Sequence, residues 1–316
     1  MSVVAVIHTT RLDYSADVVE AVMDTRLGPF SDAHQRWDAF SLRAGPGAAV
    51  RRYADGFGNA AHLITLRRPH RYVEIVTQGT IETLLDDPFS LPVLPPRPLT
   101  PLEKHDFLSP STLVPRDPSL EELAQPYRAG GETEGLQAVQ ALMAWVYESF
   151  TYRKDVTTVA TTVTEVLAGR TGVCQDFAHL LIGLCRAAGI PARYVSGYIV
   201  SAGSQATQVR PTQTQSTQSQ SQQSGQDGMT QSQSQSQVAQ GTPPPRGAGA
   251  SHAWIEAWTP AYGWRGFDPT NNLLASTLHV KMATGRDYAD VPPSRGTFRG
   301  QATESLTVEV VARPLD

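Results

Sequence analysis

The chain of 316 residues has little that would tie it to a membrane, a nucleic acid or a secretory route. No apolar run approaches the roughly 20 residues needed to cross a bilayer. The formal net charge is -4 and the isoelectric point is near 6.1, so no electrostatic feature favours a nucleic-acid partner or an anionic membrane surface. The first ten residues lack a basic leader and a long apolar core, and we therefore expect no signal peptide there.

Cysteine is almost absent, since only Cys174 and Cys185 occur. Both fall in one predicted helix, where they would stand about 16 Å apart along the axis at roughly 1.5 Å per residue, too far for a disulfide. A reducing, cytoplasmic compartment is therefore expected. The Cys and His spacings typical of a structural metal are also missing, and the sequence predicts no cofactor and no metal.

What the chain does have is a change of pattern along its length. Residues 1 to about 85 contain short β-branched runs separated by turn signals such as Asp55 to Asn59, which predicts an N-terminal β-sandwich-like domain. Residues 86–117 hold the proline-dense stretch 91–98, which predicts an extended connector. Helical periodicity begins near residue 118, and strands follow, so residues 118–316 are expected to form a second domain and the fold class is α+β.

One segment of that second domain has a different composition. Gln, Ser and Thr dominate residues 202 to about 248, with no apolar periodicity, so this tract cannot bury enough surface to offset its ordering entropy. It separates two predicted strands. Because loop-closure entropy grows only logarithmically with length, a disordered surface insertion of this size is tolerable.

A cysteine stands where a glycine-containing turn enters the clearest predicted helix, Cys174 to Ala188, which Gly189 ends. A thiol at that position meets the positive end of the helix dipole and the free N–H groups of the first turn, and both favour thiolate. The alternative is a buried structural cysteine. That is the better interpretation of Cys185, which shares the apolar face of the helix.

A histidine and an aspartate stand in matching positions on a predicted hairpin. His252 begins a strand with tryptophans at alternating positions, and Asp268 ends the next strand just before a proline. The hairpin would bring the two side by side, so that the carboxylate holds the imidazole tautomer and stabilises the imidazolium. Either residue alone could be structural, Asp268 as a turn cap. Together with Cys174 they form the set that a thiol nucleophile requires.

Several polar residues beside the nucleophile have open roles. An oxyanion formed in acyl transfer is expected to bind the Cys174 backbone N–H and one side-chain donor, for which Tyr152 and Gln175 are candidates. Asp176 lies in the first helical turn, where a carboxylate complements the dipole, so a structural role is at least as reasonable as a catalytic one. His179 is expected to pack or to hydrogen-bond beneath the site.

These segments resemble the transglutaminase-like superfamily, the papain-like group of Cys–His–Asp enzymes. The core resemblance rests on the segments Gly172 to His179, Gly189 to Tyr198, Ser251 to Trp254 and Gly263 to Asn271. Three more segments, His8 to Thr10, Asp55 to Asn59 and Thr284 to Pro293, resemble the bacterial branch, in which an N-terminal β domain precedes the core.

The resemblance implies a papain-like core with the nucleophile helix packed on an antiparallel sheet. It also implies Cys174 as nucleophile, His252 as base and acid, and Asp268 as the residue that orients the imidazole. The long insertion at about 202–248 departs from the family pattern. A passive tract is the simpler interpretation, and the alternative is that its glutamines act as acyl donors in self-modification.

The implied chemistry is acyl transfer from an amide through a thioester, on a protein or peptide substrate. Water as acceptor gives a cysteine peptidase or amidase, and a primary amine gives a transglutaminase. We expect the hydrolase, because the sequence lacks the acidic calcium site of animal crosslinking enzymes. Transglutaminase activity is the first alternative. A catalytically silent peptide-binding module is the second, and the oligomeric state stays open.

Overall fold

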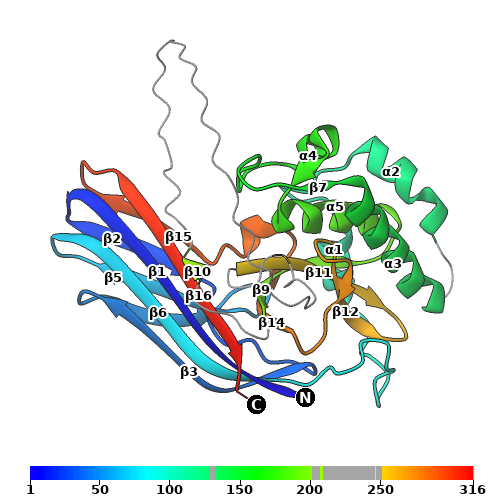
Figure 1. The fold of residues 1–316 in the computed structure, drawn as a ribbon, viewed down its shortest axis with the longest axis horizontal. Coiled ribbons are helices and arrows are strands. Elements are labelled where there is room, and N and C mark those ends of the chain that lie inside the picture. The colour runs from blue at the N-terminus through cyan, green and yellow to red at the C-terminus, as the bar shows by residue number, and fades with distance from the viewer. Residues whose placement is uncertain (129–131, 201–206, 209–245, 247–250, 316) are drawn as a thin grey trace, which may run out of the picture.

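The computed structural model describes residues 1–128, 132–200, 207–208, 246 and 251–315. The insertion expected at 202–248 lies outside these residues except for Thr207, Gln208 and Arg246. The molecule has two parts (Figure 1): a β-sandwich, in which both chain ends meet, and an α+β core, which carries helices α1 to α5. Among the described residues, no helix is long and apolar enough to span a bilayer.

The β-sandwich begins with six strands, which lie in the N-terminal region that the sequence predicts to be β. They are β1 (Ser2–Val18), β2 (Glu20–Thr25), β3 (Gln35–Gly45), β4 (Ala49–Ala54), β5 (Ala60–Leu66) and β6 (His70–Thr83). They contribute to two antiparallel sheets, one ordered β10-β16-β1-β6-β3 and the other β15-β2-β5-β4. Apolar residues of both sheets, such as Leu12, Ile64 and Ile75, pack between them. The predicted N-terminal β region is therefore present.

The end of the chain requires a correction. Residues 118–316 were expected to form one domain, but β15 (Ser294–Arg299) pairs with β2, and β16 (Glu304–Pro314) pairs with β1. The short β10 (Thr207–Gln208) pairs with β16 in turn. Alternating apolar residues indicate a strand but not its partner, so the sequence could not assign these strands to the sandwich.

The connector at 86–117 also differs from the extended segment expected. It contains helix α1 (Pro101–Leu108), which begins at a capping box. The Thr100 hydroxyl accepts from the Glu103 backbone N–H, and the Glu103 carboxylate accepts from the Thr100 backbone N–H. With proline at the first helical position, the start signal was complete in the sequence, and the surrounding prolines obscured it.

The α+β core packs helices against an antiparallel sheet, which confirms the predicted fold class. After α1, its helices are α2 (Pro118–Ala124), the 3-10 turn η1 (Gln125–Tyr127), α3 (Glu132–Ser149), α4 (Val163–Gly169), α5 (Cys174–Ala187) and the 3-10 turn η2 (Tyr288–Asp290). The sheet order is β13-β12-β11-β9-β14, with β9 (Ala192–Ile199), β11 (Ser251–Thr259), β12 (Gly263–Asp268), β13 (Leu273–Leu274) and β14 (His279–Gly285). Two short parallel strands, β7 (Thr151–Tyr152) and β8 (Thr171–Gly172), lie beside the start of α5.

Helix α5 lies at the centre of this core. Residues from Gln175 to Cys185 are all buried, because α2, α3 and α4 cover the faces that the sheet leaves free. At its end, Gly189 takes a positive φ of 82°, as a helix-terminating glycine does. The helix predicted for Cys174 to Ala188 is therefore present to within one residue.

The two parts share a buried interface along one face of β1. The second half of that face, including Leu12, packs inside the sandwich. The first half, including Val4 and Val6, packs against Tyr198 of β9 and Met282 of β14. The core sheet therefore rests directly on the sandwich.

Candidate active site

The three residues predicted to act together come from three elements that meet. Cys174 is the first residue of α5, His252 is the second residue of β11, and Asp268 is the last residue of β12. Strands β11 and β12 pair as an antiparallel hairpin, and α5 packs against β11. The local signals that end each element therefore place all three side chains at one edge of the helix–sheet interface.

The histidine and the aspartate form a buried pair. Nε2 of His252 lies 2.8 Å from Oδ2 of Asp268, and neither side chain is exposed. Trp254 stacks beside the imidazole at a ring separation of 6.1 Å. The second ring nitrogen, Nδ1, has no partner of regular hydrogen-bond geometry among the described residues, which leaves it for the thiol of Cys174.

The electrostatics of the pair favour an imidazolium. Burial alone would lower the pKa of His252, but the Asp268 carboxylate and then Cys174 outweigh it and raise the pKa to about 10. At neutral pH the ring therefore carries its proton in the folded protein. Cys174 itself is partly exposed, whereas its two partners are buried.

Asp268 is held by more donors than the hairpin alone supplies. Its Oδ1 accepts the backbone N–H groups of Thr270 at 3.0 Å and Asn271 at 3.3 Å. Its Oδ2 accepts Nδ2 of Asn271 at 2.8 Å and faces Nε2 of His279 at 3.3 Å, in addition to His252. Burial would raise the pKa of this carboxyl, but these contacts and the charge of His252 hold it well below its usual range.

Sequence reasoning missed Asn271 and His279. Asn271 stands three residues after Asp268, at a spacing from which a side chain can hydrogen-bond back, and this signal was available. His279 opens β14, which is the far edge of the sheet in strand order. Its position beside Asp268 depends on how the intervening loop returns, and no local pattern predicts that.

Asp176 has a defined structural contact. One of its carboxylate oxygens, Oδ2, accepts the Val173 backbone N–H and the Thr157 hydroxyl, each at 2.7 Å. It therefore holds the turn that precedes the nucleophile and caps the start of α5. Burial raises its pKa despite these two donors.

The two candidate oxyanion donors differ in their surroundings. Tyr152 is partly buried near the nucleophile, and burial, followed by the charge of Cys174, raises the pKa of its phenol to about 12, so the hydroxyl keeps its proton. Gln175 is buried, and its side-chain amide donates to the Val159 carbonyl at 3.3 Å. The phenol of Tyr152 therefore keeps its donor, and the Gln175 amide has one N–H committed to Val159 and a second N–H left.

His179 lies beneath the site, as the sequence suggested. Its Nε2 accepts the Tyr288 backbone N–H at 3.2 Å, and its ring centroid lies 5.3 Å from that of Tyr194. Burial lowers its pKa to about 4, so the ring is neutral at physiological pH. Within the described residues, no group of three or more His, Cys, Asp or Glu side chains is arranged to hold a metal ion.

The sequence was also compared with known families. Residues 121–269 match the profile of the transglutaminase-like superfamily, and residues 4–82 match the bacterial transglutaminase-like N-terminal region. An uncharacterized protein of Mycobacterium tuberculosis is 32% identical over 322 residues, covering 97% of this chain and 91% of the relative. The chain belongs to the transglutaminase-like superfamily.

Two further similarities are to proteins whose names describe an activity. A protein-glutamine gamma-glutamyltransferase of Pseudomonas aeruginosa is 27% identical over 191 residues, which cover 58% of this chain and 24% of that protein. A crystal structure from Cytophaga hutchinsonii, described as that of a candidate cysteine protease, superposes with a TM-score of 0.69 at 23% identity and covers 100% of this chain and 92% of that one. That likeness shows that the fold of this chain, over both of its parts, is shared with that structure.

Proposed function

We propose that this protein is a cysteine-dependent acyl-transfer enzyme that acts on peptide or isopeptide amide bonds through a thioester. One observation supports this most strongly: the buried His252 ring lies 2.8 Å from Asp268 and leaves its other nitrogen for Cys174 at the start of a helix. A base, an orienting carboxylate and a thiol in this relation are what nucleophilic catalysis by cysteine requires. A structural cysteine is typically buried, as Cys185 is, whereas Cys174 is partly exposed.

The first step forms the tetrahedral intermediate that precedes the thioester. The Cys174 thiolate attacks the carbonyl carbon of the substrate amide, a C–S bond forms, and the carbonyl electron pair moves to oxygen. The Cys174 backbone N–H, free at the helix start, and the Tyr152 hydroxyl are the two donors proposed for this oxyanion. Tyr152 suits the role because its phenol is protonated and near the sulfur.

The second step releases the amine. The oxyanion collapses, the C–N bond breaks, and the His252 imidazolium gives its proton to the leaving nitrogen, so that a neutral amine departs and a thioester remains. Asp268 stays ionised throughout and orients the ring through Nε2. The now neutral His252 can then take a proton from the acceptor that attacks the thioester.

The acceptor decides between two reactions. We favour water, which makes the protein a cysteine peptidase or amidase. The related Pseudomonas aeruginosa protein bears a transferase name, and this similarity supports transamidation to a primary amine as the second candidate. Both reactions share the same first half and the same residues. A reducing, cytoplasmic location fits the two free cysteines and belongs to the proposal.

Peptide libraries offer a direct test. The protein is incubated with peptides in the presence and absence of an added primary amine, and products are identified by mass. Cleaved or deamidated products that need no amine indicate a hydrolase, whereas amine-linked products indicate a transglutaminase. Cys174→Ala serves as the inactive control. If wild type and this variant give the same products, the protein is a binding module and the proposal fails.

A further inference from the structure

The carboxylate of Asp268 faces two imidazoles instead of one. His279 Nε2 lies 3.3 Å from Oδ2, the same oxygen that lies 2.8 Å from His252 Nε2. Both histidines and the aspartate are almost fully buried, and the His252 and His279 rings are 6.5 Å apart. The proposed reaction uses only His252, so the second histidine has no role in it so far.

The contacts of His279 settle which of its nitrogens carries the proton. Its Nδ1 can only accept the hydrogen bond from the Ser276 backbone N–H, at 3.4 Å. A neutral ring therefore carries its proton on Nε2 and donates it to Asp268. The indole of Trp254 meets the His279 ring edge-on at 5.2 Å and stacks with the His252 ring at 6.1 Å. Trp254 thus packs against both rings.

The strand that carries His279 is held by the β-sandwich. β14 is the outer strand of the core sheet, so its free backbone groups need partners. The side-chain amide of Gln35 in β3 donates to the Lys281 carbonyl at 2.7 Å and accepts the Lys281 N–H at 2.8 Å. Asn59 does the same at Thr284, with both distances 2.8 Å. Each side-chain amide thus makes the two hydrogen bonds to β14 that a backbone residue of a neighbouring strand would make.

A buried ion cluster fixes the same strand. The Lys281 ammonium contacts Glu256 of β11 within the core sheet and Asp32 of the sandwich. Because His279 and Lys281 lie on one face of β14, two residues apart, a shift of the strand would move the imidazole relative to Asp268. The sandwich therefore determines where the second histidine stands.

We propose that His279 is a positioning residue for the reaction: its Nε2–H holds the Asp268 carboxylate toward His252, and the amide clamp of Gln35 and Asn59 holds His279 in place. This rests on the proposed function, because it assigns a role within the same triad. The role assigned to His279 involves no contact with the substrate. Its effect passes through Asp268, which must keep one orientation while His252 gains and loses its proton.

The test uses the reaction of Cys174 with iodoacetamide, which needs no knowledge of the substrate. Alkylation rates are measured from pH 4 to 11 in wild type, His279→Gln and His279→Phe. The glutamine amide can replace the Nε2 donor, whereas phenylalanine fills the space without a donor. Wild type should already react in acid, because the thiolate–imidazolium pair lets the sulfur ionise well below the pKa of a free thiol.

We expect His279→Phe to lower the alkylation rate at neutral pH by about tenfold, which is what loss of one hydrogen bond to a charged group produces. The pH at which the rate rises should also move upward, because a less well oriented carboxylate stabilises the imidazolium, and with it the thiolate, less strongly. His279→Gln should stay within about threefold of wild type and keep the pH of this rise. Thermal unfolding of both variants shows whether the fold is retained.

Each contrary result has a separate meaning. An unchanged rate and an unchanged pH of this rise in His279→Phe would show that the ring only fills space, and the positioning role would be excluded. If His279→Phe does not fold, a loss of about tenfold in the folded His279→Gln variant excludes the role as well. A wild-type rate that rises only where a free thiol ionises removes the thiolate–imidazolium pair and with it both the proposed function and this inference.

Discussion

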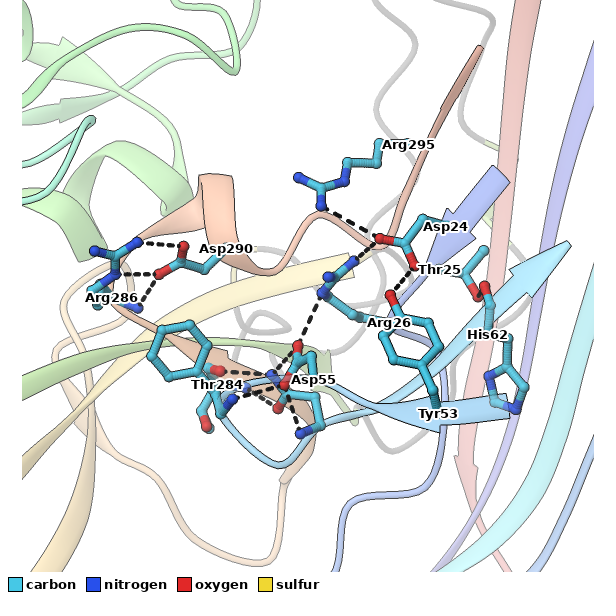
Figure 2. Close-up of polar contacts among 12 residues, drawn as sticks. Asp24, Thr25, Arg26, Tyr53, Asp55, His62, Thr284, Arg286, Asp290 and Arg295 are labelled. Carbon is cyan, nitrogen blue, oxygen red and sulfur yellow. Dashed lines mark hydrogen bonds and ion pairs between the residues drawn. The ribbon is translucent and has the colours of Figure 1, made fainter. Parts of the chain in front are cut away.

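Two clusters of buried charge in this molecule use aspartate in opposite ways. In the β-sandwich, Arg26 lies between Asp24 and Asp55, at 2.6 Å and 3.1 Å, and Tyr53 donates to Asp24 (Figure 2). In the core, Asp268 faces histidines. A guanidinium keeps its charge at every physiological pH, and an imidazole does not.

The difference teaches which cluster can do chemistry. The Arg26 cluster is a fixed arrangement of charges, and burial of Asp24 is offset by Tyr53 and Arg26, which hold its pKa below the usual value. This arrangement holds the loop at residues 55–59 in place, because Asp55 also accepts the backbone N–H groups of Phe57 and Asn59. In the proposed reaction, the Asp268 cluster passes a proton to the substrate through His252. On that proposal the sandwich contributes fixed charges, and the core contributes a group that gains and loses a proton.

The sharpest way to break the comparison is to remove the charge of Asp268. Asp268→Asn should lower turnover about a thousandfold, because a neutral amide cannot stabilise the imidazolium. The fold should persist, since the remaining oxygen still accepts the backbone N–H groups of Thr270 and Asn271. Turnover on the peptides found active, with circular dichroism of the same samples, checks both parts.

Asp155→Asn is a matched control. It removes one carboxylate from an exposed residue, and Asn tolerates the positive φ of 63° found there. Its turnover should equal that of wild type. Unchanged turnover in Asp268→Asn would remove Asp268 from the triad.

A second prediction concerns pH. The pKa of His252 is raised in the fold, from 6.5 to about 10. Its contribution to stability should therefore be complete below pH 6.5 and should be lost as the pH rises through about 10. The urea midpoint of wild type should fall across this range, and that of His252→Gln should fall less. Parallel curves for the two proteins would show that the ring is not held as an imidazolium.

Sequence alone was sufficient for the parts of the site that local signals define. The sequence indicates where three elements begin or end: the helix that begins at Cys174, the strand that begins one residue before His252, and the strand that ends at Asp268. A helix–sheet core and a β region before it followed from periodicity. The family signature further predicted that these three elements converge.

What the sequence could not supply depends on contacts between distant segments. Gln35 and Lys281 meet across the two parts of the molecule, and the sequence around either residue does not indicate the other as its partner. The same holds for β16, which pairs with β1 from the far end of the chain. His8 and Asn59 are instructive, because both lie in segments that resemble the family yet far from the nucleophile. They contact Tyr198 and Thr284, so these segments join the sandwich to the core.

A milder way to sharpen the comparison is to loosen the clamp on β14. Gln35→Met keeps the length of the side chain but leaves the Lys281 N–H and carbonyl without partners. Alkylation of Cys174 by iodoacetamide should slow about threefold at neutral pH, because the effect reaches Asp268 only through His279. Gln78→Met, at an exposed site on β6, makes the same chemical change and should leave the rate alone. If Gln35→Met and Gln78→Met react equally fast, the β-sandwich does not influence the position of the active-site residues.

The smallest effect on turnover is expected where the charges are fixed. Arg26→Met should leave turnover within about twofold of wild type, because Asp55 retains its own N–H donors and the loop keeps its shape. It should lower the free energy of unfolding by about 3 kcal/mol, because two largely buried carboxylates lose their cation.

Arg295→Met provides the matched comparison for this cluster. Arg295 contacts the same Asp24 at 3.4 Å, but its side chain is 58% exposed, so the loss in urea unfolding should stay below about 1 kcal/mol. If Arg26→Met instead loses turnover while folded, the sandwich cluster takes part in the reaction. The division between fixed and titratable charge would then not separate scaffold from site.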